Sequence, residues 1–407
     1  MSRARRSHPG FPLALALAVT CVVGRTALAS PLVYVTEKHS NAVAVIDAAT
    51  NSIVKQVGIG DSPSEIAVTP DRRFVYAVNA GSKSSDVSII DVGSEQVVHT
   101  VAVGKLPLAI EFGPDGAFAY VTDTGGAGVS VIDTLADKVV ATITVGASPA
   151  GLAVTPDGRW LYVANAQDLN QPRPGTVSVV DTATNAAVGD VPVGNNPFAI
   201  AITPDGRAAY VVNSSSLMTR GRGSVSVIDT ATNTVGATIP VGNNPLGVAI
   251  TPDGRSAYVT DFSDNTVHVI DTASRTASKT IAVGNGPLGI AITPDGRYAY
   301  VANRQPFGEP ANGDVSVIDT ADNAVVATIP VGSNPTGVAI GVPPVCAGDC
   351  DGDGAVGIAE LLRAVNIALG DSDVAQCTAA DLSGDGIVTV NELLAAVNAT
   401  LVGCPTP

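Results

Sequence analysis

One short run of residues recurs along the chain and constrains the fold more than any other feature of the sequence. Close copies are TPDGRWLYVAN (155–165), TPDGRAAYVVN (203–213), TPDGRSAYVTD (251–261) and TPDGRYAYVAN (293–303), and looser ones stand at 69–79 and 113–123. Aligning them shows a longer unit, in which Tyr-Val-x-Asn precedes Val-Ser-Val-Ile-Asp-Thr and a run that ends in Val-Gly, first at Gly58. The aspartate of this unit occurs seven times, at Asp47, Asp91, Asp133, Asp181, Asp229, Asp271 and Asp319.

Each unit contains four short runs rich in β-branched residues, separated by turn residues. Four strands in each repeat of 42 to 48 residues are typical of a propeller blade, whereas the β-branched content excludes solenoids of paired helices. The repeat region begins at Tyr34, in the second run of a unit, and its last run, 336–340, is the first run of a unit. The two ends of the repeat region therefore complete one blade together. We therefore predict an all-β, seven-bladed propeller of four-stranded antiparallel blades over residues 30–342.

The repeat resembles a known family. YVTN-like strands, VSVIDTATN and IPVGNNP followed by TPDG are similar to the YVTN-type seven-bladed β-propeller repeats of exported and cell-surface proteins. The resemblance covers roughly Ser30 to Val342, and it implies the fold much more strongly than it implies an activity.

The recurrent aspartates are explained by turns. Pro252-Asp253-Gly254 and its copies are expected to close the hairpin between the innermost strand and the next, with glycine at a positive φ and aspartate bonding the local backbone. Runs such as Asp229–Asn233 are expected to close the hairpin between the outer two strands. Seven aspartates at one repeat position indicate seven hairpins rather than seven catalytic acids.

Three units are longer than the rest because of the loop after Tyr-Val-x-Asn, at 166–176, 214–224 and 304–314. Strand alternation places these loops on the same face as the Val-Gly turns. They carry Arg173, Arg220, Arg222 and Arg304, which form a candidate rim for an acidic or carbohydrate ligand on blades 4, 5 and 7. The alternative is that surface loops have simply drifted in length and composition.

Signatures of an enzyme are missing from the repeats. His39, His99 and His268 fall in different units without metal-ligand spacing, and the repeats contain no cysteine, nucleophile elbow or phosphate loop. An enzyme is therefore the less favoured interpretation. A lactonase-like activity is kept as the alternative, because carboxylates and arginines from several blades can converge in a central channel without forming a sequence motif.

The composition changes after a linker at 343–348. Residues 349–360 and 381–392 each form a 12-residue calcium loop, with oxygen ligands at positions 1, 3 and 5, a backbone carbonyl at 7, and a bidentate glutamate at 12. The predicted ligand positions of two Ca²⁺ sites are Asp349, Asp351, Asp353, Ala355, Gly357, Glu360, Asp381, Ser383, Asp385, Ile387, Thr389 and Glu392. The second loop carries fewer charges, so we expect weaker binding there.

Each loop runs into an apolar-striped helix, at 360–369 and 392–401, so we predict a small α-helical calcium-binding domain over 349–407. Two loop–helix units resemble dockerin-type modules. Ile358-Ala359 and Val390-Asn391 depart from that pattern where dockerins recognise a partner, which puts a cohesin partner in doubt. Cys346, Cys350, Cys377 and Cys404 indicate two disulfides in an oxidising compartment, and their pairing is open.

The N-terminus has the pattern of a secretory signal. Arginines precede the apolar run 11–23, and Ala27-Leu28-Ala29 supplies a cleavage site, so residues 1–29 are a predicted signal peptide. No other stretch approaches the roughly 20 apolar residues of a membrane span. The formal charge of −15 argues against a nucleic-acid partner.

These features together predict a secreted protein, located in the periplasm, at the cell surface or outside the cell. We expect a non-enzymatic binding scaffold, with a ligand face on the propeller and a tail that docks to a protein or to a cell-surface polysaccharide. The alternatives are a channel-sited, lactonase-like enzyme and a structural component of a surface layer.

Overall fold

The fold is described here from a computed structural model of the chain. It describes residues 30–82, 84–167, 173–214, 222–304 and 312–341 and, in the C-terminal part, 348, 356–370, 372, 377, 380 and 388–402. The predicted signal peptide, most of the predicted linker and most of the two predicted calcium loops therefore lie outside the described residues.

Within this part of the chain, 28 strands form seven antiparallel sheets of four. Blade 1 contains β28 (Pro335–Gly341), β1 (Leu32–Glu37), β2 (Ala42–Asp47) and β3 (Ser52–Gly58). Blade 2 contains β4 (Pro63–Val68), β5 (Phe74–Asn79), β6 (Asp86–Asp91) and β7 (Gln96–Ala102), and blade 3 contains β8 (Pro107–Phe112), β9 (Phe118–Asp123), β10 (Gly128–Asp133) and β11 (Lys138–Thr144).

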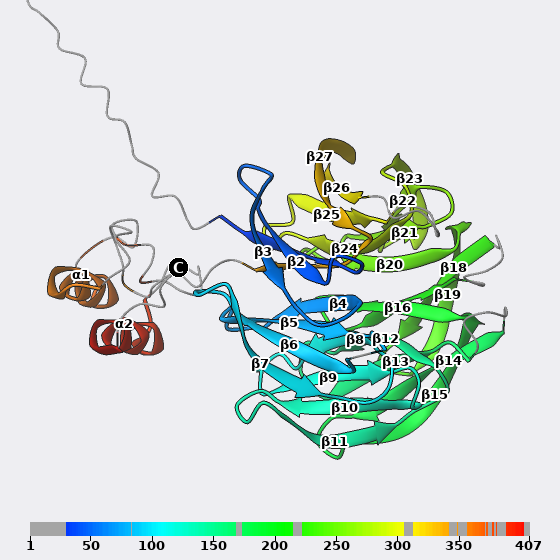
Figure 1. Cartoon of the computed structure of the whole chain (residues 1–407), viewed down its shortest axis with the longest axis horizontal. Helices are drawn as coiled ribbons and strands as arrows, with labels where there is room; N and C mark the ends of the chain where they lie inside the picture. The colour runs from blue at the N-terminus through cyan, green and yellow to red at the C-terminus, as the bar shows by residue number, and fades with distance from the viewer. Residues whose placement is uncertain are drawn as a thin grey trace, which may run out of the picture.

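The remaining blades follow the same order. Blade 4 contains β12 (Pro149–Val154), β13 (Trp160–Asn165), β14 (Pro174–Asp181) and β15 (Ala186–Asn195), and blade 5 contains β16 (Pro197–Ile202), β17 (Ala208–Asn213), β18 (Arg222–Asp229) and β19 (Thr234–Asn243). Blade 6 contains β20 (Pro245–Ile250), β21 (Ser256–Asp261), β22 (Thr266–Asp271) and β23 (Thr276–Ala282), and blade 7 contains β24 (Pro287–Ile292), β25 (Tyr298–Asn303), β26 (Asn312–Asp319) and β27 (Ala324–Ser333). Figure 1 shows the inner strands, such as β4, β8 and β20, gathered around a common centre.

The two ends of the propeller meet in one sheet, as the phase of the repeats predicts. β28 pairs antiparallel with β1, with Val33 opposite Ile340 and Tyr34 opposite Ala339. The last strand thus forms the inner edge of the first blade. This pairing closes the ring and leaves no open sheet edge between blades 1 and 7.

The predicted turns are confirmed in detail. Gly254 has φ of 71°, and the carboxylate of Asp253 accepts hydrogen bonds from the backbone N–H of Arg255 and the hydroxyl of Thr251. In the outer hairpin, the Asp229 carboxylate accepts hydrogen bonds from the backbone N–H groups of Ala231 and Thr232 in the same turn, and Asn233 has a positive φ of 55°. These aspartates form turns, as the sequence indicates.

The core lies between neighbouring blades. A typical apolar cluster joins Val43 and Val45 of blade 1 to Val75 and Ile90 of blade 2. In four blades the buried tyrosine of the second strand also ties the blade to the outer hairpin of the next. Its hydroxyl donates to Oδ1 of an Asp or Asn in the pairs Tyr76–Asp137, Tyr162–Asn233, Tyr258–Asn323 and Tyr300–Asn51.

A buried polar side chain ends the second strand of every blade, and the set comprises Glu37, Asn79, Asp123, Asn165, Asn213, Asp261 and Asn303. The turn glycine of the preceding blade lies directly on it, so that a Cβ at Gly146, for example, would collide with Asn165. This contact explains the recurrent Val-Gly pair. In the first unit the glycine in this place is Gly60, on Asn79, and not Gly58, because a Cβ at Gly58 would meet no neighbour.

Two helices form in the C-terminal part, α1 (Ile358–Ala368) and α2 (Val390–Val402), each beginning two residues before its predicted start. Ala364 and Ile367 of α1 are buried in a small cluster with Val388 and Cys377, which is in a disulfide. No helix in the described residues is long and apolar enough to cross a membrane.

We expect Asp123→Asn to stabilise the propeller at neutral pH. Burial raises the pKa of Asp123, and one of its carboxylate oxygens has no partner among the described residues. Because the folded-state pKa lies above the unfolded one, the penalty is absent below the unfolded pKa and grows as the pH rises through the folded pKa. Urea unfolding should show a gain of about 1 kcal/mol near pH 7.5 that shrinks toward about pH 4.

The reverse exchange, Asn165→Asp at the equivalent position of blade 4, is the matched control. It should destabilise the propeller at neutral pH, since it puts a carboxylate in a place that an amide fills. A gain in both variants, or a loss in both, would contradict this account of the buried position.

Candidate functional site

The inner strands surround a central channel, and their side chains follow the repeat closely. Counting from the proline that begins each inner strand, the third residue is Ala109, Gly151, Ala199, Gly247, Gly289 or Gly337 in six blades. The fifth residue is Ala67, Ala153, Ala201, Ala249, Ala291 or Ala339 in six blades. The exceptions are Glu65 at the third position of blade 2 and Glu111 at the fifth position of blade 3.

Glycine occupies several of the third positions where neighbouring inner strands approach closely. A Cβ at Gly247 would collide with the carbonyl oxygen of Leu288, and one at Gly289 with that of Thr336. A Cβ at Gly337 would lie 2.8 Å from a carboxylate oxygen of Glu65. The glutamate therefore occupies room that glycine leaves on the adjacent strand.

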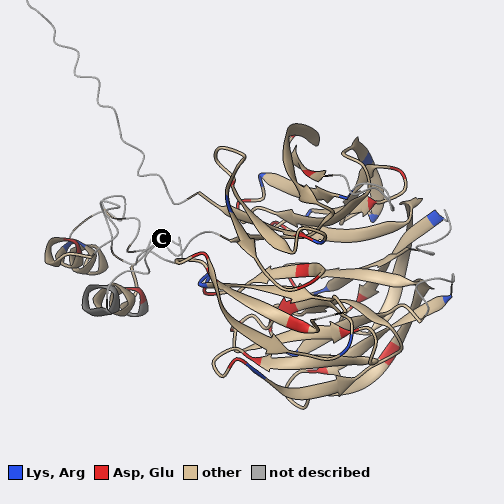
Figure 2. Cartoon of the chain, viewed as in Figure 1, with Lys and Arg blue, Asp and Glu red and all other residues tan. Residues whose placement is uncertain are grey.

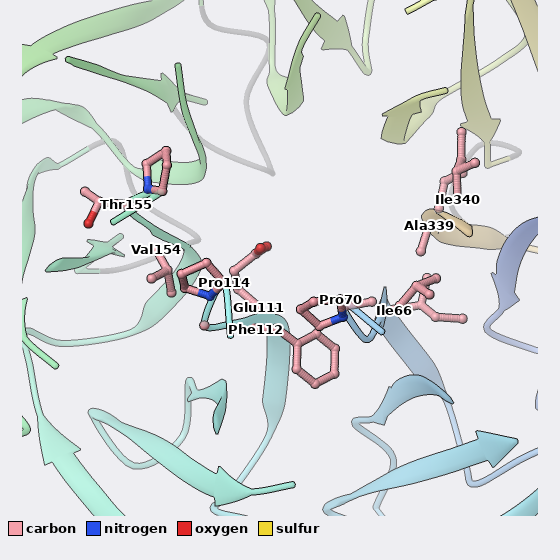
Figure 3. Close-up of a pocket in the computed structure, with 14 residues that line it drawn as sticks. Ile66, Pro70, Glu111, Phe112, Pro114, Val154, Thr155, Ala339 and Ile340 are labelled. Atoms are coloured by element: carbon pink, nitrogen blue, oxygen red, sulfur yellow. The ribbon is translucent and has the colours of Figure 1, made fainter. Parts of the chain in front are cut away.

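A cavity of about 440 Å³ lies where inner strands β28, β4, β8 and β12 end, next to the Pro-Asp-Gly turns. We call this end of the channel the Pro-Asp-Gly mouth, and the end at which the inner strands begin the Val-Gly mouth. The residues that line it are mainly of apolar type and include Ile66, Phe112, Pro114 and Ile340, although polar atoms form as much of its exposed wall as apolar ones. Figure 3 shows the carboxyl group of Glu111 pointing into the open space between them.

Glu111 is the one ionisable side chain among the described residues that line the cavity. Its side chain is exposed to the open space of the channel, and desolvation by the surrounding protein raises its pKa to about 7. Burial also raises the pKa of Glu65 to about 7, opposed by the backbone N–H of Ile66 and assisted by the charge of Glu111. At neutral pH a carboxyl with this pKa is protonated in about half of the molecules, so it can donate as well as accept a hydrogen bond.

Glu65 and Glu111 were not among the predicted site residues. Carboxylates, arginine and histidine converging on the channel would favour an enzyme, whereas a lining of Val, Ala and Ser would argue against one. The described lining of the cavity contains one carboxyl group and neither arginine nor histidine. The signal that could have revealed Glu65 and Glu111 was present in the repeat alignment, as glutamates where other units have Ala or Gly.

The predicted arginine rim is distributed over three blades. Arg173 precedes β14, Arg222 begins β18, and both are exposed, whereas the half-buried Arg304 follows β25. Arg220 lies outside the described residues. The extended hairpins confirm that the long loops adjoin the Val-Gly turns, because Arg222 pairs with Asn243. Figure 2 shows charged residues as small separate patches on largely uncharged blades.

One histidine replaces a repeat residue. His268 stands where five other blades have a serine that contacts the buried polar side chain, and its Nε2 lies 2.8 Å from Oδ2 of the buried Asp261. The hydrogen bond to Asp261 raises the pKa of His268. This arrangement substitutes an ion pair for an Asn–Ser hydrogen bond inside blade 6.

Four of the twelve predicted calcium positions are described: Gly357, Glu360, Thr389 and Glu392. Each glutamate is buried and turns back toward its loop, with Glu360 Oε2 accepting from the Gly357 N–H at 2.8 Å and Glu392 Oε2 from the Thr389 N–H at 2.7 Å. The other eight positions lie outside the described residues, and the described part of the chain contains no cluster of three or more metal-ligating side chains. The calcium sites and the docking partner stay predictions.

Comparison with protein families gives a match over most of the propeller. Residues 83–216 and 209–343 match the family described as the cytochrome D1 heme domain. The two segments together span 83–343, which is more than half of the 407 residues. No curated protein sequence matches the chain.

Solved structures share the propeller. Hydrazine synthase from Kuenenia stuttgartiensis is 25% identical, with a TM-score of 0.62 over 71% of this chain and 92% of that one. A functionally unknown protein from Desulfotomaculum acetoxidans DSM 771 is 20% identical, with a TM-score of 0.62 over 77% and 99%. Dihydro-heme d1 dehydrogenase NirN in complex with DHE is 17% identical, with a TM-score of 0.56 over 75% and 74%. The last two likenesses show the fold alone.

We expect Glu111→Gln to lower the pKa of Glu65. The negative charge of Glu111 is one of the causes that raise the pKa of Glu65, and glutamine removes that charge while keeping the size of the side chain. NMR titration of ¹³C-labelled glutamate carboxyl groups measures the change. Glu95→Gln, on the outer hairpin of the blade that contains Glu65, is the matched control and should leave the pKa of Glu65 unchanged. An unchanged pKa of Glu65 in both variants would contradict the coupling.

Proposed function

Because the chain belongs to the cytochrome D1 heme domain family, whose fold it shares, we propose that it is a binding scaffold whose ligand enters the central channel. The observation that carries this proposal is the cavity at the Pro-Asp-Gly mouth, which is lined mainly by residues of apolar type and has Glu111 pointing into it. Small-molecule sites are usually concave and combine such residues with a few convergent polar groups. The similarity of the repeats to YVTN-type propellers and the signal-like residues 1–29 support a scaffold that acts outside the cytoplasm.

The chemistry of the cavity favours a small, mainly apolar ligand with one hydrogen-bonding group. Its volume of about 440 Å³ falls within the range of small-molecule pockets, which is about 300–1,000 Å³. Glu111, with a pKa of about 7, can donate to a carbonyl or accept from a hydroxyl or amine. We favour binding over acid–base catalysis because Glu111 is the one ionisable group among the described residues that line the cavity.

The family description raises heme as a ligand, and the cavity residues do not fit it. Heme iron is held by His, Cys, Met or Tyr, and the described lining of the cavity contains none of these. The Glu111 carboxyl group would also face the carboxylates of a heme in the same apolar space. His39 lies on an exposed turn at the other end of the channel, among the polar groups of Lys38, Ser40 and Asn334.

We expect the full chain to bind 1-aminoanthracene, a small neutral aromatic probe, with increased fluorescence. Ala67→Phe should abolish the increase, because Ala67 lines the cavity and the larger ring fills it. Ala249→Phe is the matched control: it makes the same change at the same repeat position of blade 6, whose inner strand contributes no residue to the described cavity wall.

Three outcomes contradict this assignment. The wild-type chain could leave the probe fluorescence unchanged, or both phenylalanine variants could weaken binding equally, which would place the probe elsewhere. Stoichiometric binding of hemin with a shifted Soret band, lost in Ala67→Phe, would show that the cavity accommodates heme after all.

We further propose that the C-terminal module binds two calcium ions. The inward-turned, buried carboxylates of Glu360 and Glu392 support this, because position 12 of a calcium loop supplies a bidentate glutamate that must bend back over its loop. Calcium would stabilise a module of about 60 residues, whose core alone is marginal.

Isothermal titration of the calcium-free full chain should resolve two sites. Glu360→Gln should remove the tighter one, since the first loop carries four carboxylates, and Glu392→Gln the weaker one. Glu95→Gln, a charge removal in the propeller, should leave both sites intact. A wild-type chain that takes up no calcium, or a Glu360→Gln chain that titrates like the wild type, would overturn the proposal.

A further inference from the structure

The residue that follows the second strand holds the same place in every blade. Its backbone N–H donates to the carbonyl of the residue that precedes the inner-strand proline, as in Lys38 to Asn334 at 2.9 Å and Arg304 to Gly286 at 2.9 Å. These hydrogen bonds recur in all seven blades, so the seven residues form a ring around the Val-Gly mouth: Lys38, Ala80, Thr124, Ala166, Ser214, Phe262 and Arg304.

The ring is uneven. In blades 2 to 5 it carries alanine, threonine or serine, whereas the three consecutive blades 6, 7 and 1 carry Phe262, Arg304 and Lys38. We call these three residues, with Asn334 and His39, the basic arc. The large and charged side chains therefore gather on one side of the mouth, as the two glutamates gather on neighbouring blades deeper in the channel.

Contacts join the members of the basic arc. Arg304 Nε donates to Oδ1 of Asn334 at 3.2 Å, and the Asn334 amide lies 2.6 Å from Nδ1 of His39. Gly286 has φ of 62°, and a Cβ there would lie 3.0 Å from the Phe262 ring and would collide with the Arg304 carbonyl oxygen. Side chains fixed by such contacts lose little freedom when a ligand binds.

The two cations of the basic arc lie close enough to affect each other. Both are half-buried, and burial lowers the pKa of each; the charge of Arg304 lowers the pKa of Lys38 further. The adjacent carboxylate of Glu37 is directed into the blade, where it accepts hydrogen bonds from the Gly332 N–H and from Gln56. An anion at this part of the mouth would be attracted by both charges.

We propose that the basic arc binds the oxyanion group, carboxylate or phosphate, of a small ligand. The Arg304 guanidinium provides planar recognition of two oxygens, Lys38 adds a point charge, and the Phe262 ring packs against an adjoining apolar part of the ligand. This site is separate from the cavity at the Pro-Asp-Gly mouth, since none of its residues lines that cavity. It also differs from the rim predicted from the sequence, because it combines Arg304 with Lys38 and not with Arg173 or Arg222.

The probes are inorganic phosphate and benzoate, titrated calorimetrically into the full chain at low ionic strength. Lys38→Gln and Arg304→Gln should each weaken binding of both probes by about tenfold or more, which corresponds to one charge-assisted hydrogen bond. Phe262→Ala should weaken benzoate only. Arg173→Gln and Arg222→Gln are matched controls that remove a charge from the same face and should bind like the wild type.

A second readout remains informative if a variant folds poorly. Benzoate should protect Lys38 of the wild-type chain from acetylation, measured by mass spectrometry, and leave acetylation of Lys279 unchanged. The proposal is overturned if the wild type binds neither probe, if all four charge-removing variants weaken binding equally, or if Lys38 is not protected. Ala67→Phe should not affect either readout, which separates this site from the proposed channel ligand.

Discussion

The antiparallel pairing of β1 with β28 is the interaction on which the rest of the structure depends. Each blade has two apolar faces, and it buries both only when the ring is closed. The cluster that joins Ile329 and Val331 of blade 7 to Val33 and Ile46 of blade 1 exists because the last strand of the chain completes the first sheet. Without that pairing, these faces and two sheet edges would be open to water.

Because seven similar blades close into a ring, the size of the side chain at some repeat positions is restricted. At the third position of the inner strands, a Cβ at Gly247 or Gly289 would collide with the backbone of the next blade. Glu65 stands at this position in blade 2 and Glu111 at the fifth position of blade 3, and the surrounding protein raises the pKa of both by desolvation. Two groups of departures from the repeat lie along the channel: Glu65 and Glu111 toward one mouth, and Lys38 and Arg304 at the other.

Much of the fold was predictable because local chemistry repeats. Pro-Asp-Gly turns, Asp-Thr-x-x-Asn turns and the closing phase of the two ends all follow from the residues themselves. The candidate site was not predictable to the same degree. The repeat alignment marks Glu65 and Glu111 as exceptions, but the sequence alone does not show that their side chains face the channel. It also does not show that Lys38 lies beside Arg304, because the two residues are brought together only by the closed ring. The repeat pattern predicts Gly58 as the turn glycine of the first unit, because it follows Val57. In the structure Gly60, two residues later, occupies that position.

A crystal structure of the full chain soaked with 1-aminoanthracene would show whether the cavity beside Glu111 is a ligand site or a packing defect. We expect electron density for the probe between Phe112 and Ile340, with its amine in hydrogen-bonding distance of the Glu111 carboxyl group. An empty or water-filled cavity in crystals that hold the probe elsewhere would contradict the proposed ligand site.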